Sequence, residues 1–288
     1  MNDVLARNIL LLGALEEIRA AAGGKNLKFI LLKGAALLTE GVYGPGEREM
    51  TDLDILIRPA DEKAFDDLLM NLGFRPMENS SQAYYRPAPG AAPPVIADLH
   101  TGLWHEKDAE ILWRRAVNVP ESANLTVPGF ADQLLHLASH TLLYHGRLGS
   151  RTLEDLGRLL EFIYRKTERA AFWREASGIA DGENLRPALY PVLTRLAAAA
   201  PALISGEELS AFAPHGAEKL KSRFFEKAAS GHSRPLEYFL PALYRPALFF
   251  RYLFPEKSFL ERRYGRRSWT NRLIRPFQLI KAIFKEEE

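Results

Sequence analysis

Thr51-Asp52-Leu53-Asp54-Ile55-Leu56-Ile57 places two aspartates one residue apart in an otherwise apolar run. The run predicts a β-strand over residues 52–57, and side chains two residues apart on a strand point to the same face. Asp52 and Asp54 therefore project together, whereas Leu53 and Ile55 face an apolar layer. Two such carboxylates repel each other unless a positive charge lies between them. Carboxylate oxygens are preferred ligands of Mg²⁺ and Mn²⁺.

The segment before this strand predicts a helix, a strand and a glycine turn. Apolar residues recur at helical spacing over residues 4–22, and the apolar run over residues 27–32 predicts a short buried strand. That strand stops at Lys33-Gly34-Ala35-Ala36, and residues 35–41 predict a short helix. The order is therefore strand, glycine turn and helix, followed by the aspartate strand.

The segment after the aspartate strand adds a third carboxylate. Asp61 is a suitable N-cap for a helix that ends at Gly73, and residues 82–87 predict one arm of a hairpin. Residues 95–100 predict another strand, whose alternation places Asp98 and His100 on one face. Three carboxylates on two strands make a metal site more credible than a solvent-exposed pair alone.

Three motifs in order give the chain a resemblance to a known superfamily. They are Leu32-Lys33-Gly34-Ala35, then Arg48-Glu49-Met50-Thr51-Asp52-Leu53-Asp54-Ile55-Leu56, then Ala97-Asp98-Leu99-His100. The chain resembles the polymerase-β-like nucleotidyltransferases, specifically the bacterial branch called the nucleotidyltransferase family. The resemblance implies an α+β fold, with a small mixed β-sheet core followed by an α-helical domain. We expect a catalytic domain over residues 1–120 and a helical domain over residues 121–288.

The resemblance also implies a reaction. The family transfers a nucleoside monophosphate from an NTP such as ATP to an acceptor hydroxyl, and pyrophosphate leaves. Two Mg²⁺ or Mn²⁺ ions are expected on Asp52, Asp54 and Asp98, and Asp98 could also accept or orient the acceptor proton. Many members carry Ser where this chain has Ala35, so Lys33 could replace that phosphate contact. The expected nucleotide-binding residues are Lys33, Gly34, Ala35 and Arg48.

Two other functions are compatible with the same aspartates. A glycosyltransferase could use the Asp-x-Asp motif to bind a metal and a nucleotide sugar. A non-catalytic nucleotide-binding or antitoxin-like interaction module is the second alternative. The sequence leaves the acceptor of a nucleotidyltransferase open among a sugar or small molecule, a tRNA end and a protein side chain.

Composition excludes several classes of protein. The chain has 288 residues, is 47% hydrophobic and 26% charged, and contains no cysteine. The lack of cysteine excludes disulfides, thiolate zinc sites and cysteine nucleophiles. No run is apolar enough for a membrane span, and the N-terminus lacks the basic region of a signal peptide. We therefore expect a cytoplasmic protein.

The histidines predict little chemistry of their own, with one exception. His136 and His140 have the spacing of a helical zinc pair, but Leu137 stands where a zinc protease has glutamate. Their segment is strongly apolar, which favours core histidines over ligands. His100 has the better claim because it shares the predicted face with Asp98. Trp104 and His105 could line the acceptor side.

Positive charge is concentrated near the C-terminus. Residues 245–285 contain eleven Arg or Lys and two Glu, although the whole chain carries a net charge of only +2. Aromatic residues alternate with these cations, a composition that suits nucleic acid or an anionic membrane surface. A helix that packs on the rest of the protein has the same composition. Contact with nucleic acid is therefore one of three roles that the segment could have.

Overall fold

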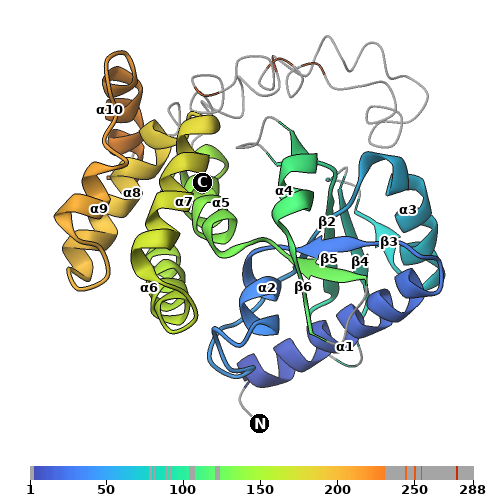
Figure 1. Cartoon of the computed structure of the whole chain (residues 1–288). Helices are drawn as coiled ribbons and strands as arrows, with labels where there is room; N and C mark the ends of the chain where they lie inside the picture. Colours follow the sequence, from blue (N-terminus) through green and yellow to red (C-terminus); the bar gives the residue numbers. More distant parts are fainter. Residues whose placement is uncertain are drawn as a thin grey trace. The chain divides into compact units, whose positions relative to one another are not determined.

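The computed structural model forms two compact units, Met1–Gln133 and Leu134–Glu288 (Figure 1). It describes residues 3–77, 80, 82–88, 90, 92–103, 108–120 and 124–230, together with 244, 250, 254 and 277. The first unit extends past residue 120, the domain boundary expected from the sequence, because β7 (Leu125–Val127) pairs with β1 (Phe29–Leu31). The sheet and the helical bundle are thus separate bodies, each with its own core.

The first unit is built on a mixed seven-stranded sheet with the order β3-β4-β5-β2-β1-β7-β6. β2 is parallel to β5, and β1 is parallel to β7, whereas the other neighbouring strands are antiparallel. This architecture confirms the predicted α+β class. The bounds of its other elements are α1 (Asp3–Gly23), α2 (Lys33–Thr39), β2 (Leu53–Leu56), α3 (Glu62–Asn71), β3 (Arg75–Pro76), β4 (Ala83–Arg86), β5 (Val95–His100), α4 (Ala109–Arg115) and β6 (Val117–Asn118).

One face of the central strands is apolar throughout. Side chains alternate along β5, where Val95, Ala97 and Leu99 are buried and the residue after each of them is partly exposed. On the same side, Phe29 of β1 meets Phe65 of α3 edge to face, with ring centroids 6.0 Å apart. α1 also contacts α3 and β5. The two helices therefore cover this face, and the residues between the apolar ones are left for the other face.

The opposite face is divided between an apolar cluster and polar side chains. Ile30, Leu56, Leu103 and Leu112 pack together there, and Trp113 of α4 packs against them. Since Ile30 pairs directly with Leu56, and Leu56 with His100, these residues share one face of the sheet. Asp54 and Asp98 lie two residues before Leu56 and His100 on the same strands. The sheet thus presents its polar residues beside a packed apolar cluster.

The predicted helices and strands of this unit are present, with one local correction. Asp61 does stand at the N-cap of α3, but its side chain accepts no hydrogen bond there, because a 3-10 turn over Pro59–Asp61 precedes the helix. Gly73, which ends the segment, has φ +84°, a backbone conformation that glycine adopts without strain.

The second unit is helical in the part that the structure describes. Its helices are α5 (Phe130–Leu143), in which the division falls, α6 (Ser150–Tyr164), α7 (Arg169–Gly182), α8 (Arg186–Ala199), α9 (Gly206–Ser210) and α10 (Glu218–Ala229). Within the described residues, no helix is both long enough and apolar enough to cross a bilayer.

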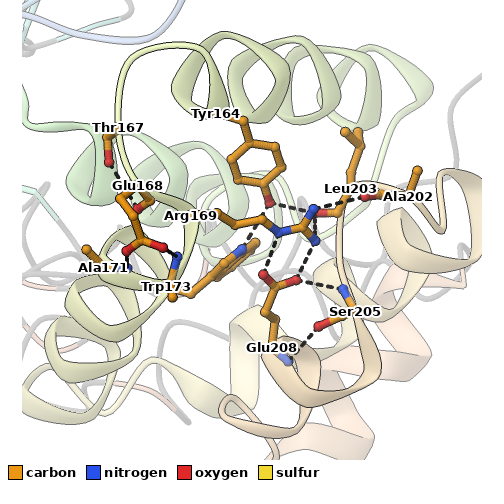
Figure 2. Close-up of polar contacts among 11 residues, drawn as sticks. Tyr164, Thr167, Glu168, Arg169, Ala171, Trp173, Ala202, Leu203, Ser205 and Glu208 are labelled. Carbon is orange, nitrogen blue, oxygen red and sulfur yellow. Dashed lines mark hydrogen bonds and ion pairs between the residues drawn. The ribbon is translucent and has the colours of Figure 1, made fainter.

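A polar network joins α6, α7 and α9 (Figure 2). The Arg169 guanidinium donates two hydrogen bonds of 2.6 Å to the Glu208 carboxylate and another to the Leu203 carbonyl. Trp173 donates to the Tyr164 hydroxyl at 2.9 Å, and that hydroxyl donates to the same carbonyl at 2.5 Å. Glu208 and Ser205 also form a capping box at the start of α9. The network therefore fixes three helix ends with matched donors and acceptors.

Candidate active site

Asp54 and Asp98 occupy facing positions on two neighbouring parallel strands. The register pairs Asp54 of β2 with Asp98 of β5, and Leu56 with His100 two residues further along. Because residues two apart on a strand share a face, Asp98 and His100 point to the same side as Asp54. Three chemically active side chains are therefore fixed by regular strand pairing rather than by a loop.

Asp54 is the centre of this cluster. Its Oδ1 accepts a hydrogen bond from Lys33 Nζ at 2.8 Å and contacts His100 Nε2 at 2.9 Å. The Asp54 side chain is 5% exposed, so both interactions act in a weakly solvated environment. Lys33 has φ +49°, a left-handed conformation that costs free energy in a residue other than glycine. The turn after β1 thus holds a strained lysine against a buried aspartate.

The three carboxylates differ in their protonation equilibria. Burial raises the pKa of Asp54, but the hydrogen bond from His100 and the charge of Lys33 outweigh it and hold the pKa below its usual range. Burial and the neighbouring Asp54 and Asp52 carboxylates raise the pKa of Asp98 to about 6. Burial and Asp54 likewise raise the pKa of Asp52. The hydrogen bond from His100 and the charge of Lys33 therefore stabilise the Asp54 carboxylate and leave the other two carboxylates undercompensated.

The arrangement fits a divalent cation. Asp54, Asp98 and His100 each offer one ligand atom, and these three atoms lie within 4.8 Å of one another. Asp98 Oδ1 is buried and has no hydrogen-bond partner among the residues that the structure describes. A buried carboxylate oxygen without a partner is costly, and a bound cation removes that cost. His100 was expected from the sequence to share this face, but it was not counted among the metal ligands.

Asp52 stands at the edge of this group. It precedes β2 and accepts a hydrogen bond from the Thr51 hydroxyl at 3.0 Å. Its charge raises the pKa of Asp98, and the charge of Asp54 raises the pKa of Asp52. Its oxygens are nevertheless not part of the close set formed by Asp54, Asp98 and His100. The two aspartates of the Asp-x-Asp motif are therefore near each other but not equivalent.

Gly34 and Arg48 are in direct contact across the glycine turn. A Cβ atom on Gly34 would lie 2.2 Å from Arg48 Nη1, so the guanidinium occupies the space that any other residue at position 34 would need. Gly34 belongs to the first turn of α2, immediately after Lys33. The sequence motifs indicated these residues separately, and the structure brings them together with Ala35, which is buried in the same turn.

Asn8 of α1 holds the loop that carries Arg48. The Asn8 amide donates to the Pro45 and Arg48 carbonyls, both at 2.6 Å, and accepts from the Met50 backbone N–H at 2.9 Å. Asn8 is fully buried. Sequence reasoning missed it, although the spacing of Asn8 from the buried Leu11 and Leu15 places a polar residue in the apolar stripe of the helix.

Arg7, the residue before Asn8, joins the backbones of the two aspartate strands. Its guanidinium donates to the Thr51 carbonyl at 2.9 Å, and to the Pro93 and Pro94 carbonyls at 2.7 and 2.8 Å. Thr51 leads into β2, and the two prolines lead into β5. One turn of α1 therefore fixes the entry of each strand that carries a candidate ligand.

Comparison with known proteins identifies the family. The profile of a family described as "Uncharacterised nucleotidyltransferase" matches residues 1–199. The chain belongs to this family. The match covers the sheet with its aspartates and continues through α8, and it confirms the predicted membership of the nucleotidyltransferases and the prediction that the protein is an enzyme. Nucleotidyl transfer, the movement of a nucleoside monophosphate from an NTP, is the activity of this class.

The other comparisons add a distant structural similarity. The crystal structure of ANT(2")-Ia in complex with adenylyl-2"-tobramycin aligns at a TM-score of 0.39 and 18% sequence identity. The alignment covers 57% of this nucleotidyltransferase and 97% of the other chain. No curated protein sequence matches the chain significantly.

The histidines of α5 and the residues expected near the acceptor are the remaining candidates from the sequence. His136 and His140 lie on α5 with ring centroids 5.5 Å apart, and among the described residues neither belongs to a set of three side chains that could hold a metal. Trp104 and His105 lie outside the described residues of the nucleotidyltransferase, as does nearly all of the basic segment over residues 245–285.

Proposed function

We propose that the protein transfers a nucleoside monophosphate from an NTP to an acceptor hydroxyl, with a divalent metal bound by the strand aspartates. The observation that carries the proposal is the pairing of Asp54 with Asp98 on parallel strands, with His100 beside them. The three ligand atoms lie close together, and within the described part of the chain one oxygen of Asp98 has no hydrogen-bond partner. A site of this composition is suited to a cation and a triphosphate.

Asp54, Asp98 and His100 would hold a first Mg²⁺ or Mn²⁺ ion, and Asp52 would complete the coordination of a second. A bound metal would neutralise the triphosphate and make the α-phosphorus more electrophilic. The undercompensated charge of Asp52 and Asp98 supports this assignment, because each added positive charge removes carboxylate repulsion.

Asp98 is the residue that we assign to the acceptor. It lies on the face that carries the proposed metal ligands, and one of its carboxylate oxygens has no hydrogen-bond partner among the described residues and could accept a proton. The acceptor hydroxyl donates its proton to Asp98 as the oxygen attacks the α-phosphorus. The bond between the α-phosphorus and the bridging oxygen then breaks, and pyrophosphate leaves.

Lys33, Gly34 and Arg48 are the residues that we assign to the phosphates. Lys33 and Arg48 carry positive charge next to the glycine turn, and Gly34 permits close approach because it has no side chain. Ala35 would contact the phosphates through its backbone N–H only. Lys33 would take the role that a serine hydroxyl after the glycine has in many relatives by exchanging its hydrogen bond to Asp54 for one to a phosphate oxygen.

The test is a labelling experiment with α-labelled NTPs. The full-length protein is incubated with each NTP, with Mn²⁺ or Mg²⁺, and with separate RNA, protein and small-molecule fractions. Label that appears in one fraction identifies the acceptor class, and the preferred NTP identifies the base. Asp54→Asn should abolish the transfer, and Asp61→Asn, at the start of α3 outside the cluster, should retain it. Equal transfer by both variants would refute the mechanism.

A further inference from the structure

A cavity of about 400 Å³ lies in the helical unit, between α8 and α10. Its lining includes Tyr190 and Arg195 from α8, and Lys219, Ser222, Arg223 and Glu226 from α10. The four α10 residues are spaced at intervals of three and four, so they share one face of that helix. The cavity therefore lies between two packed helices, which fix its shape.

The charge of the cavity is predominantly positive. It is lined by three cationic side chains and one carboxylate. Neither Lys219 nor Arg223 forms an ion pair with any residue that the structure describes. Most exposed cations on helices can pair at intervals of three or four residues. Two cations that face one cavity without such partners are available to a ligand.

Arg195 is oriented within this lining. Its Nη2 donates to the Ser230 hydroxyl at 2.8 Å, and that hydroxyl donates to the Glu226 carbonyl at 2.8 Å. The guanidinium is therefore attached to the end of α10 while the rest of its donors remain for other contacts. Ser222, which is buried, adds a hydroxyl to the same lining. Orientation before binding lowers the entropic cost of recognising a ligand.

From this placement we propose that the cavity binds a phosphate-bearing small molecule. Two arginines and a lysine match the charge of a phosphate, and a guanidinium can donate two parallel hydrogen bonds to it. The Tyr190 ring gives the lining an apolar surface for the sugar or base that carries the phosphate. The volume is large enough for such a molecule, because small-molecule sites span roughly 300–1,000 Å³.

The site is distinct from the aspartate cluster in position and in chemistry. Its recognition uses cations and hydroxyls, and it contains no set of three metal-ligating side chains among the described residues. Binding should therefore persist without a divalent metal, whereas a triphosphate at the aspartate cluster depends on one. This difference makes the two proposals separable in one experiment.

The experiment is calorimetric titration of the full-length protein in EDTA with AMP, ribose 5-phosphate, inorganic phosphate and, as an uncharged control, adenosine. We expect saturable binding of at least one phosphate compound and none of adenosine. Arg195→Ala and Arg223→Ala should each weaken it by roughly tenfold, since charge-assisted hydrogen bonds are lost. AMP binding alone would assign the site to a nucleotide, and ribose 5-phosphate binding would assign it to a sugar phosphate.

Lys221→Ala is the matched control, because Lys221 lies on α10 but outside the lining. Arg195→Lys keeps the charge and should retain part of the affinity. The proposal is overturned if no phosphate compound binds saturably, or if Lys221→Ala weakens binding as much as Arg223→Ala does. Thermal unfolding of each variant identifies any loss of binding that comes from misfolding. If Arg195→Ala misfolds, the affinity of Arg195→Lys provides an independent measurement.

Discussion

The aspartate cluster on the sheet and the arginine network in the helical unit are both groups of buried or half-buried charges, but they are balanced differently. In the network, Arg169 and Glu208 match each other with two hydrogen bonds, and the remaining donors reach carbonyls (Figure 2). In the cluster, Lys33 and His100 both contact Asp54, while a buried oxygen of Asp98 has no hydrogen-bond partner among the described residues. The arginine network satisfies its own charges, and the aspartate cluster does not.

This difference separates a structural role from a functional one. A matched network stabilises the fold and gains nothing from a ligand, because every strong donor already has an acceptor. A cluster whose charges are undercompensated lowers the free energy of unfolding. Such clusters occur at functional sites, where a bound ligand removes that unfavourable contribution. Removing a charge from the aspartate cluster should therefore raise stability and lower activity, whereas removing one from the arginine network should lower stability and leave activity unchanged.

The largest expected effect is that of Asp98→Asn. We expect nucleotidyl transfer to fall by about a thousandfold or more, since a ligand and a proton acceptor are lost together. In EDTA at pH 7.5, stability should rise by about 1–3 kcal/mol, because the folded-state pKa of about 6 lies above the unfolded value. The protonated Asp98 side chain therefore adds to the free energy of unfolding at low pH, and this contribution is lost as the pH rises through 6. Labelling and urea unfolding measure the two effects.

The control for this prediction is the same unfolding experiment at pH 4. There Asp98 is largely protonated in the folded protein, so the variant and the wild-type protein should differ little in stability. A variant that transfers normally, or one that is less stable than the wild type at pH 7.5, would contradict the role assigned to Asp98.

The next largest effect is expected in the arginine network. Glu208→Gln should lower the free energy of unfolding by about 1–3 kcal/mol, because Arg169 loses the carboxylate that accepts both of its short hydrogen bonds. The rate of nucleotidyl transfer per folded molecule should not change. Urea unfolding and labelling of the same preparation measure both quantities. The prediction is wrong if nucleotidyl transfer is lost while stability is preserved.

A smaller effect is expected when Gly34 is replaced by alanine. The added Cβ displaces the Arg48 guanidinium, which lies 2.2 Å from its position. The end of a flexible side chain can move, so stability should change by less than about 1 kcal/mol. If Arg48 binds the phosphates, the KM for the NTP should rise by roughly tenfold while kcat changes less. Gly13→Ala, where the added atom meets nothing within 4 Å, is the control that should leave KM unchanged.

The sequence was sufficient to predict the strands and the face on which their aspartates lie, because alternation and apolar runs are local properties. It predicted the β2 strand and the face shared by Asp98 and His100, which the parallel register then confirmed. It could not rank Asp52 below Asp54, since that ranking depends on which carboxylate Lys33 and His100 reach across the sheet. It also missed Arg7 and Asn8, whose partners lie about forty or more positions away in the chain.

The last effect, confined to neutral and alkaline pH, concerns Glu40, a half-buried acid at the end of α2. Burial raises its pKa to about 7, although Gln133 donates a hydrogen bond of 2.6 Å to it. The folded protein therefore binds this proton more tightly than the unfolded chain, so the contribution of Glu40 is favourable below pH 4.5 and is lost as the pH rises through 7. Glu40→Gln keeps the hydrogen-bond acceptor and removes the charge.

We therefore expect Glu40→Gln to be more stable than the wild type by about 1–2 kcal/mol at pH 8, and nearly equal to it at pH 4.5. Urea unfolding at the two pH values measures the difference, and Glu161→Gln, at an exposed position of α6, should show none. Equal behaviour of the two variants would mean that Glu40 is ionised without cost. Glu40 would then belong with the matched network, and the undercompensated charge found among the described residues of this unit would lie on the face that carries Asp98.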